Sequence, residues 1–159
     1  MNNTKTVLLS VGILCFALLG FALYMQHAHD YMPCPLCVLQ RYAFTALGAV
    51  CLVSAFLRPG AARIGNGLGL LAALTGAGIA GYHVWVKAHP SVSCGIDPLE
   101  TALNRIPPAK LLPQVFRADG FCTAEYPPLL GLSFPQWSLI WFALFAIALG
   151  WTLFRRQAR

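Results

Sequence analysis

The sequence predicts an all-α integral membrane protein, a single domain of residues 1–159 built as a bundle of four transmembrane helices. Hydrophobic residues make up 58% of the chain and charged residues only 10%, against about 25% charged residues in an average soluble protein. Four apolar stretches are each close to the length of about 20 residues that spans a bilayer as a helix. A soluble chain of this size could not bury so much apolar surface, so the composition strongly favours a membrane protein over the alternative of a soluble, unusually apolar helical bundle.

The first two predicted spans cover residues 7–25 and 38–57. The first span is longer than the apolar core of a signal peptide, which has about 7–15 residues. No clear small-x-small cleavage site follows it, so we expect it to remain as an anchor. A short polar loop, residues 26–37, joins the two spans. Arg58-Pro59-Gly60 ends the second span.

The third and fourth predicted spans cover residues 64–86 and 136–154. In the third, Ala72, Gly76 and Ala80 recur every four positions, a spacing of small residues that lets membrane helices approach closely. The fourth opens with Trp137 and closes near Trp151. Tryptophan at both ends suits the two membrane interfaces.

The loop between the third and fourth spans, residues 87–135, is rich in proline and too polar to cross a membrane. Loops of this length are usually functional or disordered. Residues 110–117 predict a short amphipathic helix lying in the membrane interface, whose length Pro113 limits. Its apolar side would consist of Leu111, Leu112, Val115 and Phe116.

The distribution of charge predicts the orientation of the spans. Cations gather at the two termini and in the short turn between the second and third spans: Lys5, Arg58, Arg63, Arg155, Arg156 and Arg159. All five acidic residues lie in the other two loops. By the positive-inside rule both termini are cytoplasmic, and the loops 26–37 and 87–135 face the periplasm of a bacterial inner membrane. This distribution explains the net charge of +6 without a nucleic-acid partner.

Cys34-Pro35-Leu36-Cys37 forms the first candidate site. A Cys-x-x-Cys arrangement favours a reactive thiolate. Cys37 falls in the first turn of the second span, where the helix dipole stabilises negative charge. Arg41 lies one turn deeper on the same side. A charged residue within a span is costly and usually faces a partner or a pathway, so we expect Arg41 to hold the Cys37 thiolate or to bind a ligand.

The other four cysteines divide into two kinds. Cys94 and Cys122 lie in the outward-facing long loop, and their spacing allows either a structural disulfide, worth about 3–4 kcal/mol in the chain-entropy model, or a second redox pair. Two outward-facing pairs can exchange electrons through mixed disulfides. Cys15 and Cys51 lie within the first two spans and are expected to pack as small hydrophobic residues.

Three interpretations of the cysteines follow. No nucleotide, haem or flavin motif is present, so a thiol relay would need an electron acceptor dissolved in the bilayer. Alternatively, His27 and His29 could complete a four-ligand metal site with the Cys-x-x-Cys pair, which would make the chain a metal-binding or assembly protein with structural loop disulfides. A membrane thiol reductase would instead need an inward-facing donor, for which Cys15 and Cys51 are the candidates.

Three runs of residues carry a resemblance to a known family. They are Cys-Pro-Leu-Cys-Val-Leu-Gln-Arg-Tyr from Cys34, Leu-Pro-Gln-Val-Phe-Arg-Ala-Asp-Gly-Phe-Cys ending at Cys122, and Gly-Leu-Ser-Phe-Pro-Gln-Trp ending at Trp137. Together with the four spans, they resemble the DsbB family of bacterial disulfide bond formation proteins. The resemblance covers residues 12–151, nearly the whole chain.

The resemblance implies a quinone-dependent thiol oxidase that reoxidises a periplasmic DsbA-like protein with a thioredoxin fold. The electron acceptor would be ubiquinone or menaquinone in the lipid. Cys94 and Cys122 would form the disulfide that oxidises the partner, with Cys94 carrying the mixed disulfide and Cys122 then exchanging with Cys34. Cys37 would pass electrons to the quinone, with Arg41 beside the quinone head.

Three further polar residues lie near the outer ends of the second and third spans. We expect Gln40 to be an interfacial polar residue. We expect His83 to be buried with its hydrogen bonds satisfied, and the resemblance leaves open whether His83 or His89 lines the quinone site.

Overall fold

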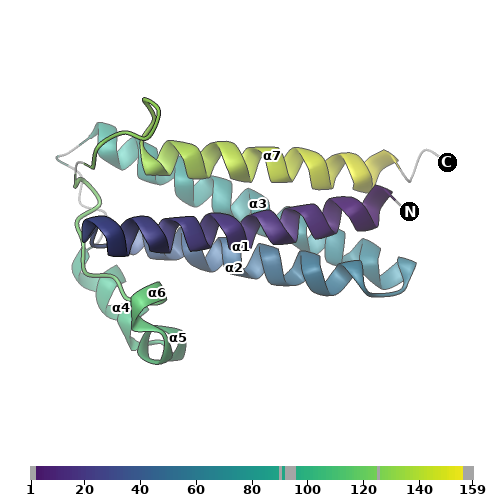
Figure 1. The fold of residues 1–159 in the computed structure, drawn as a ribbon, viewed down its shortest axis with the longest axis horizontal. Coiled ribbons are helices and arrows are strands. Elements are labelled where there is room, and N and C mark those ends of the chain that lie inside the picture. The colour runs from purple at the N-terminus through teal and green to yellow at the C-terminus, as the bar shows by residue number, and fades with distance from the viewer. Residues whose placement is uncertain (1–2, 90, 92–95, 125, 156–159) are drawn as a thin grey trace.

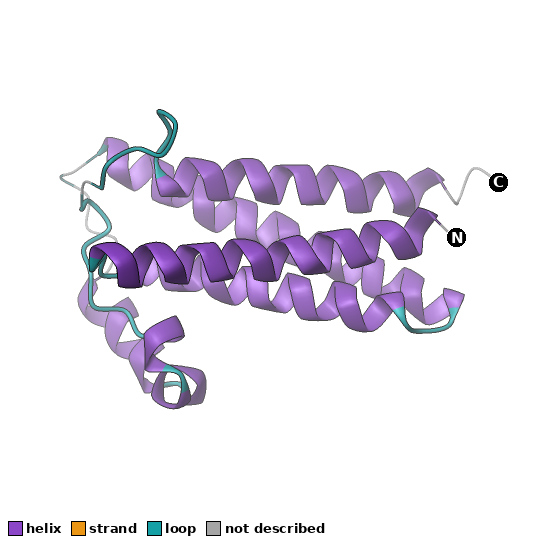
Figure 2. Ribbon diagram, viewed as in Figure 1, coloured by secondary structure: helices purple, strands orange, loops and turns teal. Residues whose placement is uncertain are grey.

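The computed structural model describes residues 3–89, 91, 96–124 and 126–155. These residues form helices and loops without any strand (Figure 2). Four helices are long and apolar enough to cross a membrane, which confirms the predicted fold class. They are α1 (Asn3–His29), α2 (Pro35–Ala55), α3 (Pro59–Ala88) and α7 (Phe134–Arg155).

The four long helices run side by side and alternate in direction (Figure 1). α2 packs between α1 and α3, and α3 packs between α2 and α7, whereas α1 and α7 touch only sparsely. α1 begins and α7 ends at the same end of the bundle, and the short helices of the long loop lie at the opposite end (Figure 1). This arrangement places both loops that follow α1 and α3 at one end.

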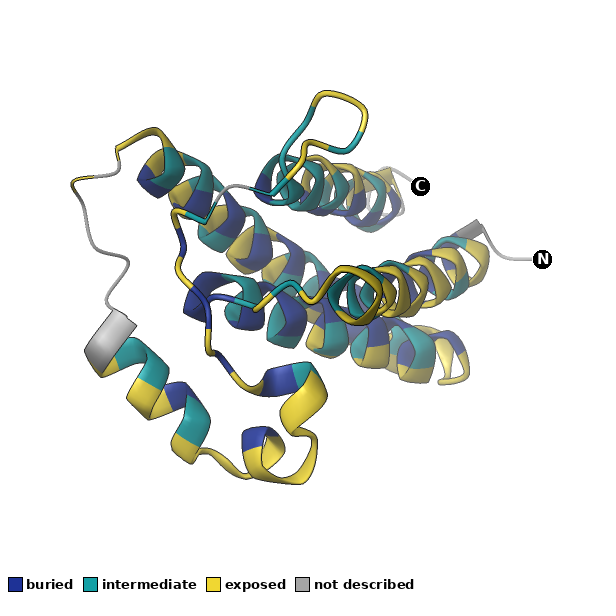
Figure 3. Ribbon diagram, turned by 60° about the vertical axis from the view of Figure 1, so that its left-hand side comes forward, coloured by how far each residue is buried: buried dark blue, intermediate teal, exposed yellow. Residues whose placement is uncertain are grey.

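The buried residues lie between the helices (Figure 3). Many residues on the outer surface are large and hydrophobic. Cys15 and Cys51 are fully buried in this core, as expected for cysteines that pack as small hydrophobic residues. On the outside, Ile64, Leu71 and Ile147 are 69%, 62% and 68% exposed. Contact with lipid explains such exposure, because lipid chains solvate apolar side chains as well as a protein core does.

Small residues of α3 allow close packing against α7. A side chain at Gly76 would overlap the ring of Phe142, so the two helices touch at this position. Ala80, which the sequence predicts for the same face, is fully buried. The expectation for Ala72 is only partly met, since it is half-buried while Ala73 is fully buried. The small-residue face therefore follows the 3.6-residue helical turn and not a strict spacing of four.

α1 extends beyond the predicted span and shortens the first loop to residues 30–34. Asp30 adopts a positive φ of 53°, and the amide of Tyr31 donates to the carbonyl of Gln26 at 3.1 Å. This is the Schellman pattern that ends many helices. Gln26 consequently lies on the last turns of α1 and not in the polar loop where the sequence analysis places it.

The described part of the long loop contains four short helices where the sequence predicts one. They are η1 (Ile96–Glu100), α4 (Thr101–Arg105), α5 (Pro107–Leu111) and α6 (Pro113–Phe116). The predicted single helix breaks at Leu112, which has φ −129° and ψ 65°, because a residue before proline avoids the helical region.

The predicted apolar side is also divided by this break. Leu111 and Leu112 are 78% and 55% exposed, a surface suited to lipid. Phe116 is buried instead and stacks on Tyr42 of α2, with the ring centroids 4.4 Å apart. The loop therefore exposes one apolar surface, formed by Leu111 and Leu112, and packs a second apolar side chain, Phe116, against α2.

Candidate functional site

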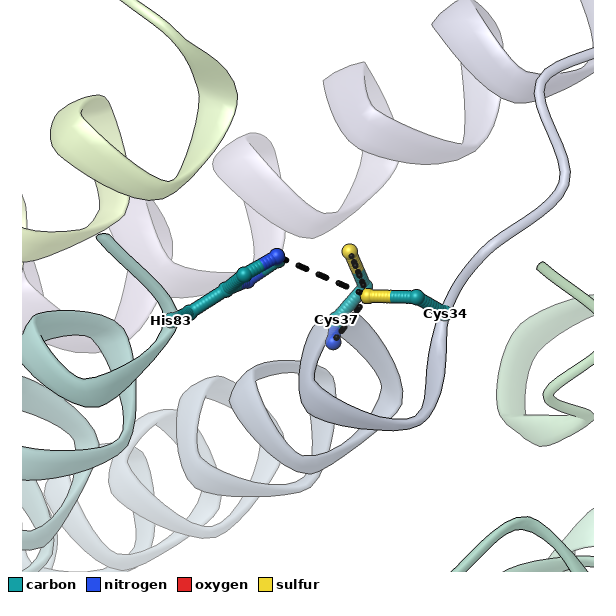
Figure 4. Close-up of side chains that lie close together, drawn as sticks. All are labelled: Cys34, Cys37 and His83. Atoms are coloured by element: carbon teal, nitrogen blue, oxygen red, sulfur yellow. Dashed lines mark hydrogen bonds between the residues drawn. The ribbon is translucent and has the colours of Figure 1, made fainter. Parts of the chain in front are cut away.

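The start of α2 fixes the positions of both thiols. Cys34 is the residue that caps the helix, with φ −78° and ψ 165°, and its Sγ accepts a hydrogen bond from the amide of Cys37 at 3.2 Å. Pro35 takes the first helical position, where its missing amide hydrogen costs nothing. As a result Cys34 Sγ lies 2.9 Å from Cys37 Sγ and donates to it (Figure 4).

The two cysteines have unequal surroundings. Cys34 is buried with 2% of its surface exposed, whereas Cys37 is partly exposed. The hydrogen bond that Cys34 donates to Cys37, together with its burial, raises the pKa of the Cys34 thiol above its ordinary value. Cys34 therefore keeps its proton at neutral pH, and negative charge on the pair is placed on Cys37.

His83 of α3 joins this pair through its ring nitrogens. Its Nε2 lies 3.7 Å from Cys34 Sγ and 3.3 Å from the carbonyl oxygen of Cys122, and its Nδ1 lies 3.1 Å from Gln40 Nε2. A carbonyl only accepts, so the Nε2 of the neutral ring carries the hydrogen and Nδ1 accepts from Gln40. His83 is buried and hydrogen-bonded as expected, but its partners belong to the thiol site.

Gln40 corrects one expectation from the sequence. It is not an interfacial side chain, because only 5% of its surface is exposed and its amide contacts His83. The sequence gives no sign of this contact, since 43 positions separate the two residues. His89, in contrast, is exposed and stacks on Trp85 outside the site.

Backbone contacts tie the long loop to the first loop. The amides of Asp119 and Gly120 donate to the carbonyl of Pro33 at 3.0 and 3.1 Å, and the hydroxyl of Tyr126 donates to the carbonyl of Met32 at 2.9 Å. A side chain at Gly120 would clash with the Met32 carbonyl oxygen, so this close approach requires glycine. Burial raises the pKa of the Tyr126 hydroxyl, which keeps it a donor.

These contacts bring Cys122 to the first cysteine pair. Cys122 is 3% exposed and packs in one buried cluster with Cys34, Leu36 and Val86. It is bonded in a disulfide, whereas Cys34 and Cys37 are free thiols. The structure thus gathers three of the four predicted redox cysteines, and the fourth, Cys94, lies outside the described residues.

Arg41 is held inside the bundle and does not extend toward water. It is 8% exposed, its Nη1 donates to the Val115 carbonyl at 2.8 Å and its Nη2 donates to Gln26 Oε1 at 2.7 Å. Gln26 in turn donates to the carbonyl of Gln114 at 3.1 Å. Arg41 and Gln26 together connect α2, α1 and α6. Gln26 could not be singled out from the sequence, because it follows the apolar run directly and resembles the start of a loop.

A cavity of about 320 Å³ lies beside these residues. Its volume falls at the lower end of the range of about 300–1,000 Å³ for small-molecule pockets. Its polar lining includes Cys34, Cys37, Arg41 and His83. The apolar lining comes from α1, α2 and α7 and from the two loops, and it includes Leu18, Phe44, Trp141, Met32 and Phe121. The cavity is therefore lined in part by α1 and α7, two helices that pack only sparsely against each other.

The alternative metal site, in which His27 and His29 would join the Cys-x-x-Cys pair, is not formed by the described residues. The described part of the chain holds one group of three potential metal ligands, and its histidine is His83, beside Cys34 and Cys37. The side chain of His27 instead contacts the carbonyl of Leu23 in its own helix, at 2.8 Å.

Comparison with known proteins gives a consistent result. The family model described as "Disulfide bond formation protein DsbB" matches residues 4–152. A protein of Herminiimonas arsenicoxydans named "Disulfide bond formation protein B" is 56% identical over 158 residues, which cover 99% of this chain and 100% of the relative. Proteins of the same name from Ralstonia nicotianae and Cupriavidus metallidurans are 47% and 48% identical, over 99% and 98% of this chain and 98% and 96% of the relatives.

Proposed function

The chain belongs to the DsbB family and has a role in disulfide bond formation, and on that premise we propose that it is a quinone-dependent thiol oxidase. It reoxidises a periplasmic DsbA-like protein and transfers the electrons to a quinone in the membrane. The observation that supports this proposal best is the free Cys34–Cys37 pair, which lines a largely apolar cavity together with Arg41 and residues of α1 and α7.

Electrons enter through the long loop in this proposal. The two thiols of the reduced partner become a disulfide while the disulfide of Cys94 and Cys122 is reduced to two thiols. The Cys122 thiolate then attacks Cys34 of an oxidised Cys34–Cys37 pair, so that Cys37 leaves as a thiolate. The Cys94 thiolate attacks Cys122 of this mixed disulfide, which restores the Cys94–Cys122 disulfide and releases Cys34 as a thiolate that takes up a proton. The shared buried cluster of Cys34 and Cys122 supports this order of exchange.

His83 is suited to assist this exchange. Its Nε2 lies near both Cys34 Sγ and the Cys122 carbonyl. A ring N–H at this position donates a hydrogen bond to a sulfur that becomes negatively charged during the exchange. Hydrogen bonds to charged groups contribute about 1.5–3 kcal/mol, enough to favour one sulfur over another as the site of charge.

The residues that line the cavity fit a quinone. Apolar walls suit its ring and tail, and Arg41 supplies donors at the end where Cys37 lies. Arg41 has five N–H donors, and its contacts with Val115 and Gln26 are formed by two nitrogens of the fork. A bound ubiquinone or menaquinone would accept the two electrons and two protons released when Cys34 and Cys37 form a disulfide. Arg41 would orient the ring and stabilise the Cys37 thiolate.

We place the cysteine end of the bundle in the periplasm and both termini in the cytoplasm. The cations of the opposite end, Lys5, Arg58, Arg63 and Arg155, support this orientation by the positive-inside rule. Arg156 and Arg159 lie outside the described residues. The partner would then meet the long loop in an oxidising compartment.

Purified protein tests the proposal directly. When it is supplied with a reduced DsbA-type protein and a short-tailed ubiquinone, we expect quinol to form catalytically. Cys37→Ser should abolish quinol formation, whereas Cys51→Ser should retain it, because Cys51 is buried in the core away from the cavity. A Cys37→Ser protein that reduces quinone at the wild-type rate would contradict the mechanism.

A further inference from the structure

Three potential ligand atoms converge where α2 begins beside α3. Cys34 Sγ, Cys37 Sγ and His83 Nε2 all lie within 4.8 Å of one another. They come from two elements and point toward a common region (Figure 4). Two thiols and one imidazole form a ligand set typical of zinc.

We propose that the reduced Cys34–Cys37 pair and His83 form a binding site for a thiophilic divalent cation, Zn²⁺ or Cd²⁺. Occupation of the site holds both sulfurs and stops the pair from transferring electrons. The inference rests on the proposed function only for the claim that the reduced pair arises during turnover, and binding itself is measured without turnover.

The distances are close to those of a tetrahedral site. Zinc bonds of about 2.3 Å to sulfur and 2.0–2.1 Å to nitrogen place neighbouring ligand atoms about 3.5–3.8 Å apart. Cys34 Sγ and His83 Nε2 are 3.7 Å apart already. The two sulfurs are 2.9 Å apart and must separate by about 0.9 Å to reach the tetrahedral spacing. Rotation of the partly exposed Cys37 side chain provides this movement.

The charge of the site permits a dication despite Arg41 and Lys87 at the same cavity. Binding follows M²⁺ + R–SH + R′–S⁻ → M(S–R)(S–R′) + H⁺, in which R–SH is Cys34 and R′–S⁻ is Cys37, so the two thiolates together neutralise the charge of the dication. Because a proton is released, affinity must rise with pH. Oxidation of the pair to a disulfide removes two ligands, so binding belongs to the reduced state.

The hydrogen bonds of the His83 ring can rearrange so that Nε2 binds the metal. Coordination through Nε2 moves the ring hydrogen to Nδ1, where a metal-bound histidine usually donates to an oxygen. Gln40, whose amide lies 3.1 Å from Nδ1, supplies that oxygen when its amide turns over. The Cys122 carbonyl, released from Nε2, or a water in the cavity takes the fourth position.

Cadmium titration of the full chain tests the site. The protein would carry Cys15→Ala, Cys51→Ala, Cys94→Ser and Cys122→Ser, so that its thiols are Cys34 and Cys37 alone. After reduction and removal of reductant without air, we expect one Cd²⁺ per chain, with a thiolate-to-metal charge-transfer absorption that strengthens with pH. Retention of Cd²⁺ by the oxidised chain, or no retention by the reduced chain, would overturn the proposal.

Histidine variants on the same background test the third ligand. His83→Ala should weaken binding by at least about tenfold. His89→Ala should leave binding unchanged, since His89 is exposed and contacts the carbonyl of Trp85. Equal affinities in His83→Ala and its parent would remove His83 from the site and overturn the proposal.

A second measurement uses the unsubstituted chain. Cd²⁺ should protect Cys34 and Cys37 together from alkylation after reduction, as mapped by peptide mass, and a chelator should restore labelling of both. Labelling of either cysteine at the metal-free rate would contradict a shared site.

Discussion

Cys34 and Cys37 lie three positions apart, yet the start of α2 gives them different chemistry. Cys34 is the helix cap, is buried, and donates a hydrogen bond to Cys37. Cys37 is partly exposed and lines the cavity beside Arg41. The hydrogen-bond direction places the proton on Cys34 and the negative charge on Cys37. Of the two cysteines that line the cavity, Cys37 is therefore the one better suited to react as a thiolate.

This difference predicts selective alkylation of the reduced protein. At pH 7.5 we expect iodoacetamide to label Cys37 more than about tenfold faster than Cys34, because the thiolate is the nucleophile. The pKa of Cys34 is raised, so its labelling should increase only as the pH passes above the usual thiol value of about 8.5. Peptide mass analysis measures both rates. Faster labelling of Cys34 would show that the proton lies on Cys37.

A second prediction concerns Arg41. Arg41→Lys keeps the charge but loses the fork that contacts both Val115 and Gln26. A charge-assisted hydrogen bond is worth about 1.5–3 kcal/mol, so we expect the apparent KM for quinone to rise by at least about tenfold. The KM for the reduced partner should not change. Lys110 is an exposed cation of the long loop that also carries Val115. Lys110→Gln serves as the control and should match the wild type in steady-state kinetics.

At the scale of elements, contacts between loops assemble the site. The amides of Asp119 and Gly120 in the long loop donate hydrogen bonds to the carbonyl of Pro33, immediately before the cap of α2. Gln26 of α1 and Arg41 of α2 donate hydrogen bonds to backbone carbonyls of α6. The short helices are thus positioned both by these hydrogen bonds and by a buried apolar cluster in which Leu103, Ala109 and Phe116 pack with Val38 of α2. The proposed exchange between Cys122 and Cys34 depends on the first of these attachments.

Gly120→Ala tests that dependence. The added carbon would clash with the Met32 carbonyl and move the loop away from Pro33. We expect partner-driven turnover to fall by at least about tenfold, since tenfold corresponds to only 1.4 kcal/mol. Direct oxidation of Cys34 and Cys37 by quinone should remain at the wild-type rate. Gly78→Ala is the matched control, because a side chain there meets open space. Equal loss in both reactions would show a general structural defect.

At the scale of the whole molecule, the four long helices pack unevenly, and the contact between α1 and α7 is sparse. α2 and α3 are packed on both sides, whereas α1 and α7 each line part of the cavity. A lipid-soluble molecule can reach such a cavity from the bilayer, while the loops above it meet water. The proposed function needs both kinds of access at one end of the bundle.

The proposed orientation predicts which positions an impermeant reagent reaches. Single cysteines placed at Lys110 and at Arg63, in a chain without other cysteines, should differ in intact cells. A membrane-impermeant maleimide should label the Lys110→Cys protein and leave the Arg63→Cys protein unlabelled until the cells are lysed. The opposite result would place the cysteine loops in the cytoplasm.

The sequence predicts the features that depend on local pattern. Apolar runs reveal the four spans, since the bilayer sets their length. The Cys-Pro-Leu-Cys motif reveals a helix start, because proline suits the first position of a helix. Arg41 is conspicuous as a charge in an apolar run. Each of these signals lies within a short segment, so the fold class and three of the site residues could be inferred without coordinates.

The sequence does not predict the features that depend on distant contacts. Gln26 reaches Arg41 across 15 positions, and His83 reaches Cys34 across 49. Neither polar residue has a local pattern that distinguishes it from a loop or a structural residue. The break at Leu112 is a different case, since Pro113 signals it locally, yet the stacking of Phe116 on Tyr42 depends on the fold.

The most direct test of the central claim is a single turnover without any partner protein. The fully reduced chain, mixed without air with one equivalent of ubiquinone, should form a Cys34–Cys37 disulfide and one equivalent of quinol. Peptide mass analysis identifies the disulfide, and absorbance measures the quinol. If Cys34 and Cys37 remain reduced, or if quinol forms equally in Cys37→Ser, the thiol pair does not deliver electrons to the quinone.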